Sequence, residues 1–204
     1  MNNYRRRLVE FAAISPAFAI PGVLASNEKT VVVTRRLVID DFQNDATRDA
    51  FGASWRGFTD RVMGGVSDGE LQMGVINGRL CARLTGRVTR ENGGGFVQMA
   101  MSFDGGQAEI DASEYKGIEL LVYGNDEDYN AHIRTADAGW HDESYRATFH
   151  ADSRWQRIQL PWEAFQPNRV PMPMDTSRIT RIGLLGWMRE FEADLAVGEI
   201  ALYA

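Results

Sequence analysis

Two glycine-rich strings constrain the fold of this chain more than any other feature. They are residues 60–69, DRVMGGVSDG, and residues 92–96, NGGGF. Glycine costs about 1 kcal/mol per residue in a helix interior, and it is used where the backbone needs positive φ or where another group approaches closely. Of the 20 glycines, 13 fall between Gly52 and Gly106. We therefore expect this quarter of the chain to be non-helical and to form the functional face.

The strings also make a prediction about backbone conformation. We expect Gly64 and Gly94 to hold positive φ, which a β-branched side chain cannot adopt without strain. Valine at either position should then cost more than about 1 kcal/mol. The alternative is that the glycines only make bulges and tight corners in a sandwich and contact no partner.

From Val31 onward, apolar and polar residues alternate in short runs separated by turn residues, which predicts half-buried β-strands. The predicted strands are residues 31–39, 71–76, 79–84, 97–103, 118–122, 145–150, 157–160, 182–187 and 197–203. The run 182–187 is apolar on both parities and should be a central strand, whereas residues 161–165 resemble one helical turn. The fold class is all-β: an antiparallel β-sandwich of jelly-roll type with about nine or ten strands and little helix.

Alternation also assigns the faces of the strands. Leu80, Ala82 and Leu84 should point into the core, and Cys81 should lie on the opposite face between two arginines. Cys81 is the only cysteine, so neither an internal disulfide nor a cysteine-rich metal site can form. Neighbouring cations would lower the pKa of its thiol, but without a partner cysteine we interpret it as a packing position.

Length and charge bound the possible functions. A chain of 204 residues suits one domain, and we assign residues 31–204 to a single β-sandwich domain. The net charge of −6 disfavours a nucleic-acid partner. We expect no cofactor.

The first 30 residues differ from the rest and form a candidate signal or targeting segment. Three arginines, Arg5 to Arg7, precede an apolar stretch from Leu8 to Ala25, as in a twin-arginine export signal of a periplasmic protein. A cytoplasmic arm, or a mitochondrial presequence in a eukaryote, is the alternative. The uninterrupted apolar run is too short to favour an integral membrane span.

Residues 65–69, GVSDG, match the spelling of a hydrolase nucleophile elbow, G-x-S-x-G. That motif requires a helix immediately after the serine, whereas residues 71–76, LQMGVI, have no helical period. We therefore interpret Ser67 as a turn residue whose hydroxyl bonds nearby backbone, and we expect no enzyme activity.

No metal site is predicted either. Asp40, Asp41, Asp60 and Asp68 could supply oxygen ligands to calcium, but their spacing shows no calcium loop, and solvated loop acids are the simpler interpretation. Residues 141–143, His-Asp-Glu, are adjacent in the chain and are expected to form a hairpin turn.

Several aromatic residues could stack on sugar rings: Trp140, Tyr145, Trp162 and Trp187. Such residues are more often in the core, where we place Trp187 and Phe149. Trp140 lies in an Ala-Gly-Trp-His loop and is the one we expect to be exposed. Trp155→Ala should cost about 3 to 5 kcal/mol if Trp155 is fully buried.

Together these motifs resemble the complex I intermediate-associated protein family. The resemblance rests on residues 62–69 and 92–96 in that order, and on residues 115–118, Gly124, Tyr129, Phe149, Trp155, 160–165 and 182–183. It implies a galactose-binding-like jelly roll, a role in assembling the membrane arm of respiratory complex I in mitochondrial members, and no catalysis. The chain departs from the family pattern at Asn125, where an acidic residue is usual, and at Val170, where glycine is usual.

Two functions follow as hypotheses. The first is a protein-interaction module that resembles respiratory complex I assembly chaperones, with respiratory-complex subunits as partners. Its expected docking face consists of Arg61, Met63, Gly64, Gly65, Ser67, Asn92, Gly93, Gly94, Gly95 and Phe96. The second is a jelly roll that binds a glycan or another small ligand at loops containing Asn125 and Trp140.

Overall fold

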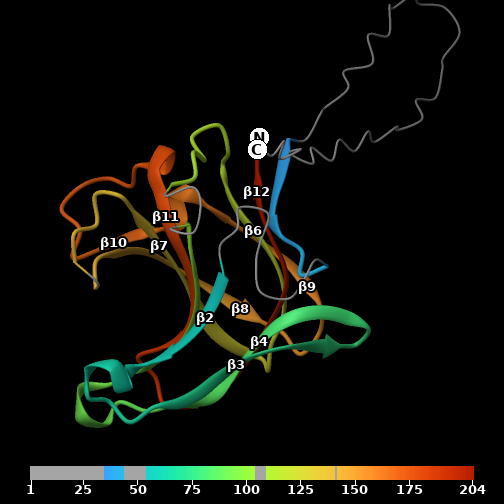
Figure 1. Ribbon diagram of the computed structural model, residues 1–204, viewed down its shortest axis with the longest axis vertical. Coiled ribbons are helices and arrows are strands. Elements are labelled where there is room, and N and C mark those ends of the chain that lie inside the picture. The colour runs from blue at the N-terminus through green and yellow to red at the C-terminus, as the bar shows by residue number, and fades with distance from the viewer. Residues whose placement is uncertain (1–34, 44–53, 104–108, 141) are drawn as a thin grey trace, which may run out of the picture.

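The computed structural model describes residues 35–43, 54–103, 109–140 and 142–204. These residues form two six-stranded antiparallel sheets that pack face to face (Figure 1), which confirms the predicted β-sandwich. The candidate targeting segment, residues 1–30, and His141 lie outside the described residues, so the expectations about them stay predictions.

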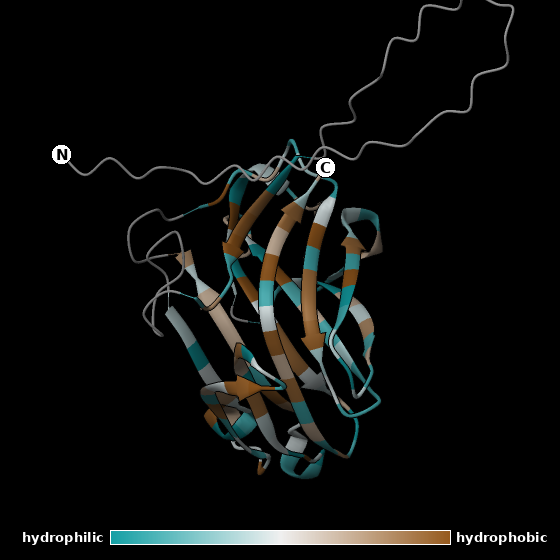
Figure 2. Cartoon of the chain, turned by 90° about the vertical axis from the view of Figure 1, so that its right-hand side faces the viewer, coloured by the Kyte–Doolittle hydropathy of each residue, from teal (hydrophilic) through white to brown (hydrophobic). Residues whose placement is uncertain are grey.

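The first sheet, sheet A, is built around the last strand of the chain. Its strands are β1 (Arg36–Asp40), β3 (Asp68–Ile76), β4 (Arg79–Val88), β6 (Gly117–Tyr123), β9 (Gln156–Pro161) and β12 (Phe191–Tyr203). The order is β3-β4-β12-β6-β9, and β1 also pairs with β12. Figure 2 shows hydrophobic and hydrophilic residues alternating along the strands, as the period-two pattern predicts.

The second sheet, sheet B, has β11 between β7 and β5. Its strands are β2 (Ser54–Thr59), β5 (Phe96–Ser102), β7 (Glu127–Thr135), β8 (Ser144–Ala151), β10 (Gln166–Asn168) and β11 (Ile179–Trp187). The order is β10-β8-β7-β11-β5-β2, so the run 182–187 is central, as predicted. Three strands were not predicted. The edge strand β2 contains little alternation, and the edge strand β10 has three residues including Pro167. The third, β7, lies inside the sheet, and its burial alternates only in part.

Helix is limited to short 3₁₀ turns in the described part of the chain. They are η1 (Asp60–Met63), η2 (Glu91–Gly93), η4 (Trp162–Ala164) and η5 (Thr176–Arg178). The turn η4 confirms the helical turn expected at residues 161–165. None of the described helices has the length and hydropathy needed to cross a membrane.

The core lies between the two sheets and follows the predicted alternation. Val97, Met99, Met101 and Phe103 are at most 1% exposed, and Phe149 is 4% exposed. Aromatic and aliphatic side chains from both sheets form one continuous buried cluster. The sandwich is therefore stabilised mainly by burial of apolar surface.

The predicted core faces are wrong at two places. Leu80 is 42% exposed, because the β3–β4 hairpin projects beyond the sandwich (Figure 1). Trp187 is only partly buried, since its ring lies on the outer face of sheet B, where the Arg146 guanidinium is 4.3 Å from the ring centroid.

Trp155 is also only partly buried, and its indole N–H donates to the Ile76 carbonyl at 3.1 Å. Trp155→Ala should therefore cost less than the full-burial value.

Candidate functional site

One buried carboxylate joins the two glycine strings. Asp60 has no exposed surface. One of its carboxylate oxygens accepts from the Ser67 amide at 2.9 Å. The other accepts from the Ser67 hydroxyl at 2.5 Å and from the amides of Gly95 at 2.6 Å and Phe96 at 3.2 Å. A single side chain thus connects residues that lie up to 36 positions apart.

The sequence around Asp60 folds into this shape for local reasons. Thr59 precedes η1, and its hydroxyl accepts from the Arg61 amide at 3.4 Å, as an N-cap residue does. Gly64 ends the turn in the left-handed conformation, with φ of 92°, and its amide donates to the Arg61 carbonyl at 3.2 Å. The prediction of positive φ is therefore confirmed at Gly64.

Gly94 is required for a different reason from the one predicted. Its φ is −72°, so the expected positive φ is wrong at this position. A Cβ on Gly94 would lie 2.4 Å from one Asp60 carboxylate oxygen, and a Cβ on Gly65 would lie 2.4 Å from the other. Both glycines therefore make room for the carboxylate, while Gly93 and Gly95 supply positive φ.

Asp60 is held in its charged form. Burial raises the pKa of its carboxyl, but the hydrogen bonds from the Ser67 hydroxyl and from the amides of Gly95, Phe96 and Ser67 outweigh burial and hold the pKa below its ordinary value. Hydrogen bonds also occupy Asp40, which accepts from the Phe42 amide and the Trp55 indole.

Ser67 lies inside this cluster. Its exposed fraction is 0%, and its hydroxyl also accepts from the Thr89 amide at 3.0 Å. The chain continues into strand β3 rather than into a helix. Both observations fit the predicted turn residue and are unlike the exposed serine of a nucleophile elbow.

Three exposed apolar side chains lie near the cluster, among exposed polar residues such as Arg61 and Asn92. Val62 and Met63 on η1 are 72% and 57% exposed. Met188, in the turn between β11 and β12, is 44% exposed and donates its amide to the Gly95 carbonyl at 2.6 Å. We call Val62, Met63 and Met188 together the tip patch, because η1 contains Asp60 and the Gly95 string contacts it.

The structure divides the predicted docking face into surface and interior. Its exposed members are Arg61, Met63, Gly64, Asn92 and Gly93. Phe96 is partly buried. The buried members are Gly65, Ser67, Gly94 and Gly95. The exposed Val62 and Met188 were missed by the sequence analysis. Val62 lies within the first string and could have been included, whereas nothing in the sequence places the β11–β12 turn beside the strings.

The two residues of the alternative ligand site are far apart. Asn125 precedes β7 and Trp140 follows it, and nine residues of strand span about 30 Å. The Asn125 side chain is also bonded on both sides, since it accepts from the Tyr129 hydroxyl at 2.6 Å and donates to the Glu192 carbonyl at 2.7 Å. Trp140 is 70% exposed, as expected.

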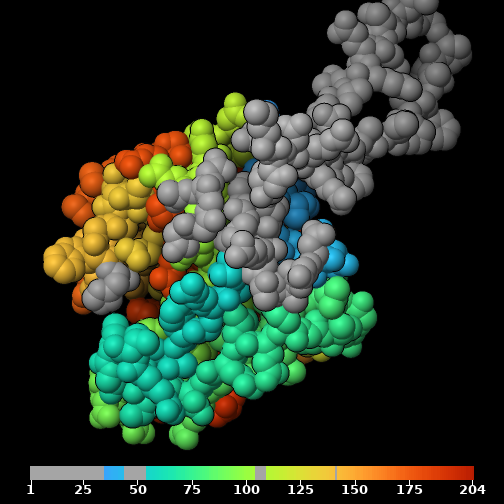
Figure 3. Space-filling model, viewed as in Figure 1, coloured from blue at the N-terminus to red at the C-terminus, as the bar shows by residue number. Residues whose placement is uncertain are grey.

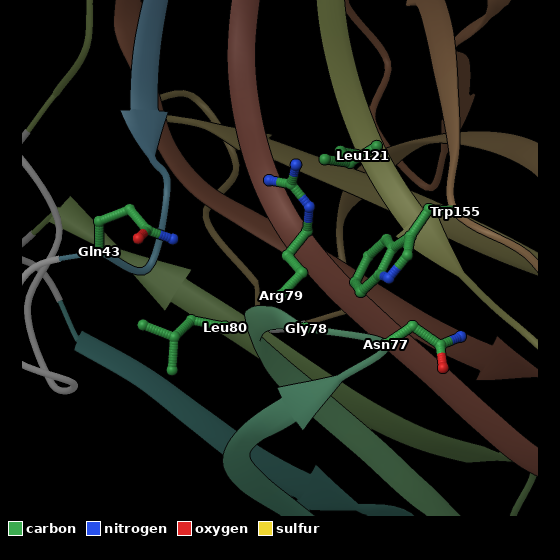
Figure 4. A pocket seen from close by; sticks show the side chains of 7 residues that line it. All are labelled: Gln43, Asn77, Gly78, Arg79, Leu80, Leu121 and Trp155. Carbon is green, nitrogen blue, oxygen red and sulfur yellow. The ribbon is translucent and has the colours of Figure 1, made fainter.

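A shallow hollow of about 580 Å³ lies on the outer side of sheet A (Figure 4). Arg79, Leu80, Leu121 and Trp155 contribute side chains, beside the turn at Asn77 and Gly78. The Arg79 guanidinium lies 5.8 Å from the centroid of the Trp155 ring. The hollow thus combines one cation with both polar residues, Gln43 and Asn77, and apolar ones, and the described residues that line it include no pair of titratable groups suited to catalysis.

Three side chains could approach one metal ion within the described part of the chain. Ligand atoms of Asp126, His150 and Asp152 lie within 4.8 Å of one another. Asp126 already accepts from Ser153, and His150 Nδ1 lies 2.9 Å from Asp128. These contacts account for the cluster without an ion, and acid neighbours raise the pKa of His150, led by its hydrogen bond to Asp128.

Similar folds occur among carbohydrate-binding modules. The family 11 module of the cellulosomal cellulase Lic26A-Cel5E of Clostridium thermocellum has a TM-score of 0.65 at 14% identity, covering 82% of this chain and 93% of that one. A family 11 module from the same organism, in complex with a β-1,3-1,4-mixed-linked tetrasaccharide, has a TM-score of 0.64 at 14% identity, and the match covers 82% of this chain and 94% of that one. The family 30 module of Cel9D-Cel44B of Clostridium thermocellum has a TM-score of 0.57 at 15% identity, and the match covers 81% of this chain and 96% of that one.

At these identities the likeness establishes the fold, a galactose-binding-like jelly roll, and nothing more. No curated protein sequence matches the chain significantly. The family model described as Complex I intermediate-associated protein 30 (CIA30) matches residues 41–200, which include both glycine strings and all but the last residues of β12. The chain therefore belongs to the Complex I intermediate-associated protein 30 family.

Proposed function

We propose that this chain is a non-catalytic protein-binding module of the assembly-factor type, which docks through the tip patch. The observation that carries the proposal is the 72% and 57% exposure of Val62 and Met63 on a turn fixed by Asp60. Neighbouring exposed apolar side chains mark interaction sites. A turn that is already ordered loses little conformational entropy on binding, and methionine adapts to varied surfaces.

Family membership suggests the partner. It favours a subunit or an assembly intermediate of respiratory complex I, and the net charge of −6 disfavours nucleic acid. Arg61 lies beside the patch and forms an ion pair with Asp68 at 3.4 Å. It would contribute to a polar rim around an apolar centre, which is the usual anatomy of a protein interface.

The absence of catalysis is also part of the proposal. Ser67 is buried, and the Asp60 carboxylate accepts four hydrogen bonds from this chain. Neither group is therefore available to attack or protonate a substrate at the tip.

The test is quantitative crosslinking and recovery of complex I subunits from the native host. Wild type is compared with the double variant Val62→Asp, Met63→Asp and with the control Val75→Asp, which adds a charge at a 63%-exposed apolar residue on the β3–β4 hairpin. We expect the double variant to recover at least about tenfold less of these subunits and the control to match wild type. Equal recovery by the double variant, with an unchanged melting temperature, would exclude the tip patch.

Glycan binding is the second candidate, favoured by the 70% exposure of Trp140 and by the likeness to carbohydrate-binding modules. A mixed-linked β-glucan oligosaccharide should then raise the melting temperature of wild type and leave that of Trp140→Ala unchanged, because the indole face would stack on a sugar ring. No rise in wild type would argue against this candidate and leave the protein-binding proposal intact.

A further inference from the structure

The outer face of sheet B concentrates positive charge in an acidic protein. Side chains at alternate positions point away from the core, since their neighbours Ile133, Tyr145 and Ile182 are buried in it. The outward positions on the three central strands include Arg134 and His132 on β7, Arg146 on β8 and Arg181 on β11. Cross-strand register places Arg134 opposite Arg181 and His132 opposite Arg146.

This face is hollowed rather than flat. β11 and β2 bow inward between the η1 end and the β7–β8 end, and the molecular surface is indented at the left of the same view (Figures 1 and 3). Gly183 lies between His132 and Ala100 in the register. A Cβ on Gly183 would lie 2.2 Å from the Gln98 amide nitrogen, so Gln98 lies across β11 close to His132.

His132 holds an unsatisfied polar atom that is buried just beneath this surface. The residue is 8% exposed, and its Nε2 has no hydrogen-bond partner among the described residues. Burial and the charges of Arg146 and Arg181 lower the pKa of His132 to about 3, so the ring is neutral at physiological pH. A buried polar nitrogen without a partner is destabilising, so its presence in a native structure requires an explanation, such as a ligand or a functional role.

The nearby guanidinium groups are held in place without being neutralised. One terminal nitrogen of Arg134 donates to the carbonyls of Trp140 at 2.8 Å and Ala138 at 3.4 Å, while its buried Nε has no partner in the described structure. Arg146 stacks on Trp187 at 4.3 Å and donates its Nε to the Ser144 hydroxyl at 3.2 Å. Carbonyls, a hydroxyl and a ring thus hold these groups, and no carboxylate of the described residues forms an ion pair with either of them.

Nearby acids do not form ion pairs with these two arginines. Asp128 is the acid on the same face of β7, and it bonds His150 at 2.9 Å. Ion pairs within 4.0 Å involve neither Arg134 nor Arg146 in the described residues. Burial, followed by the charge of Arg169, lowers the pKa of Arg146, while the charge of Asp142, which pairs with Arg169, acts in the opposite sense.

We infer that this surface binds a small ligand through an oxyanion, a carboxylate or a phosphate, held by Arg134, Arg146 and His132. Planar guanidinium groups bind such anions through paired hydrogen bonds. Like charges on neighbouring strands repel, and an anion between them removes that cost. A neutral sugar would leave the charges uncompensated, so charge distinguishes this ligand from a neutral glycan. The surface shares no residue with the tip patch, although Trp187, on which Arg146 stacks, precedes Met188 in the chain. Either proposal can therefore fail alone.

Calorimetric and ¹H–¹⁵N NMR titrations of the full chain at constant ionic strength test the inference. The anionic probes are inorganic phosphate and galacturonate. Galactose is the neutral control, because it differs from galacturonate only in having a hydroxymethyl group in place of the carboxylate. We expect saturable binding of at least one anion, with no binding of galactose. Which anion binds more tightly distinguishes a phosphate source from a carboxylate source.

Variants then locate the site. Arg146→Gln and His132→Gln should each weaken anion binding by about tenfold or more, the value of one charge-assisted hydrogen bond. Arg87→Gln removes an exposed arginine from sheet A and should bind as wild type does. Without anion, Arg146→Gln should melt no earlier than wild type, because it removes repulsion. No saturable anion binding, equal binding of galactose, or equal weakening in Arg87→Gln would overturn the inference.

Discussion

The carboxylate of Asp60 leaves room for a hydrogen atom, but not for a methyl group, at Gly65 and Gly94. Gly64, which precedes Gly65, is constrained by its backbone and not by its neighbours. A Cβ on Gly64 would meet nothing within 4 Å, but the φ of 92° disfavours any residue with a side chain. Adjacent glycines thus serve different physical requirements. Alanine substitution separates the two at the scale of single residues.

Gly94→Ala should lower the free energy of unfolding by about 3 kcal/mol, because the methyl group displaces a carboxylate on which buried amides depend. Gly64→Ala should cost only about 1 kcal/mol, the price of an alanine at positive φ. Urea unfolding of both variants measures the difference. Equal losses would show that backbone conformation alone, rather than the Asp60 carboxylate, explains both glycines.

The sequence indicates that these positions must be glycine, but it does not indicate why. A glycine can show that a side chain is excluded from a position, and it does not show which neighbouring atoms exclude it. The excluding atoms belong to Asp60, whose partners include amides 35 and 36 residues away. Only the pairing of β5 with β2 brings those amides to Asp60, at the end of β2, and a single sequence does not specify that pairing.

At the scale of elements, the β3–β4 hairpin offers a matched pair of glycines. Gly86 has φ of 154°, and a Cβ there would lie 2.1 Å from the Asp68 carbonyl oxygen of the paired strand. Gly74, on the other strand of the hairpin, has nothing within 4 Å of the equivalent position. One glycine permits close strand contact and the other is open to solvent.

We expect Gly86→Ala to cost about 2 kcal/mol or more, because the strands must separate or shift register. Gly74→Ala should be neutral or stabilising by up to about 1 kcal/mol, since alanine restricts the unfolded chain. Thermal melts of the two variants provide the comparison. A Gly74→Ala variant as unstable as Gly86→Ala would contradict the contact geometry.

The elements themselves were largely predictable. Strands with one buried face, such as β5 and β8, follow directly from alternation. The exposure of Leu80 was not predictable, because alternation gives a face but not whether the opposite sheet extends far enough to cover it. The arginine-rich face of sheet B was also missed, since Arg134, Arg146 and Arg181 come from three separate strands whose order only the structure provides.

For the whole molecule, acid should be destabilising through His132 and through two carboxyls. The pKa of His132 is lowered to about 3, so its contribution declines as the pH falls below its ordinary value of about 6.5. The pKa of Asp60 is lowered, as described. For Glu119, burial raises the pKa, but hydrogen bonds from Gln159 and the charges and bonds of Arg36 and Arg157 outweigh burial.

A folded pKa below the unfolded value means that the stabilisation from these two carboxyls is complete above about pH 5 and is lost as the pH falls below about 4, through the lower folded pKa values. Burial raises the pKa of Asp40, which acts in the opposite sense.

The unfolding free energy of wild type should therefore decline below about pH 6.5 through His132, and the two carboxyls should add to this decline below about pH 5. Asp60→Asn should be less stable at pH 7 and should decline less steeply in acid, because the titrating group is gone. Asp68→Asn removes a side chain that is 81% exposed and should follow the wild-type profile. Denaturant midpoints from pH 3 to 7 supply the measurement, and parallel profiles for Asp60→Asn and wild type would refute the assignment.

The position of β12 has a consequence for how the chain is made. This 13-residue strand follows all the other strands in the chain, yet it lies between β4 and β6 and also pairs with β1. A ribosome adds about 5 to 20 residues per second, from the N-terminus onward. Sheet A thus has no centre until β12 has left the ribosome, and the sandwich closes only then. A chain that lacks this one strand would leave the backbone edges of β4 and β6 without the strand that pairs with both.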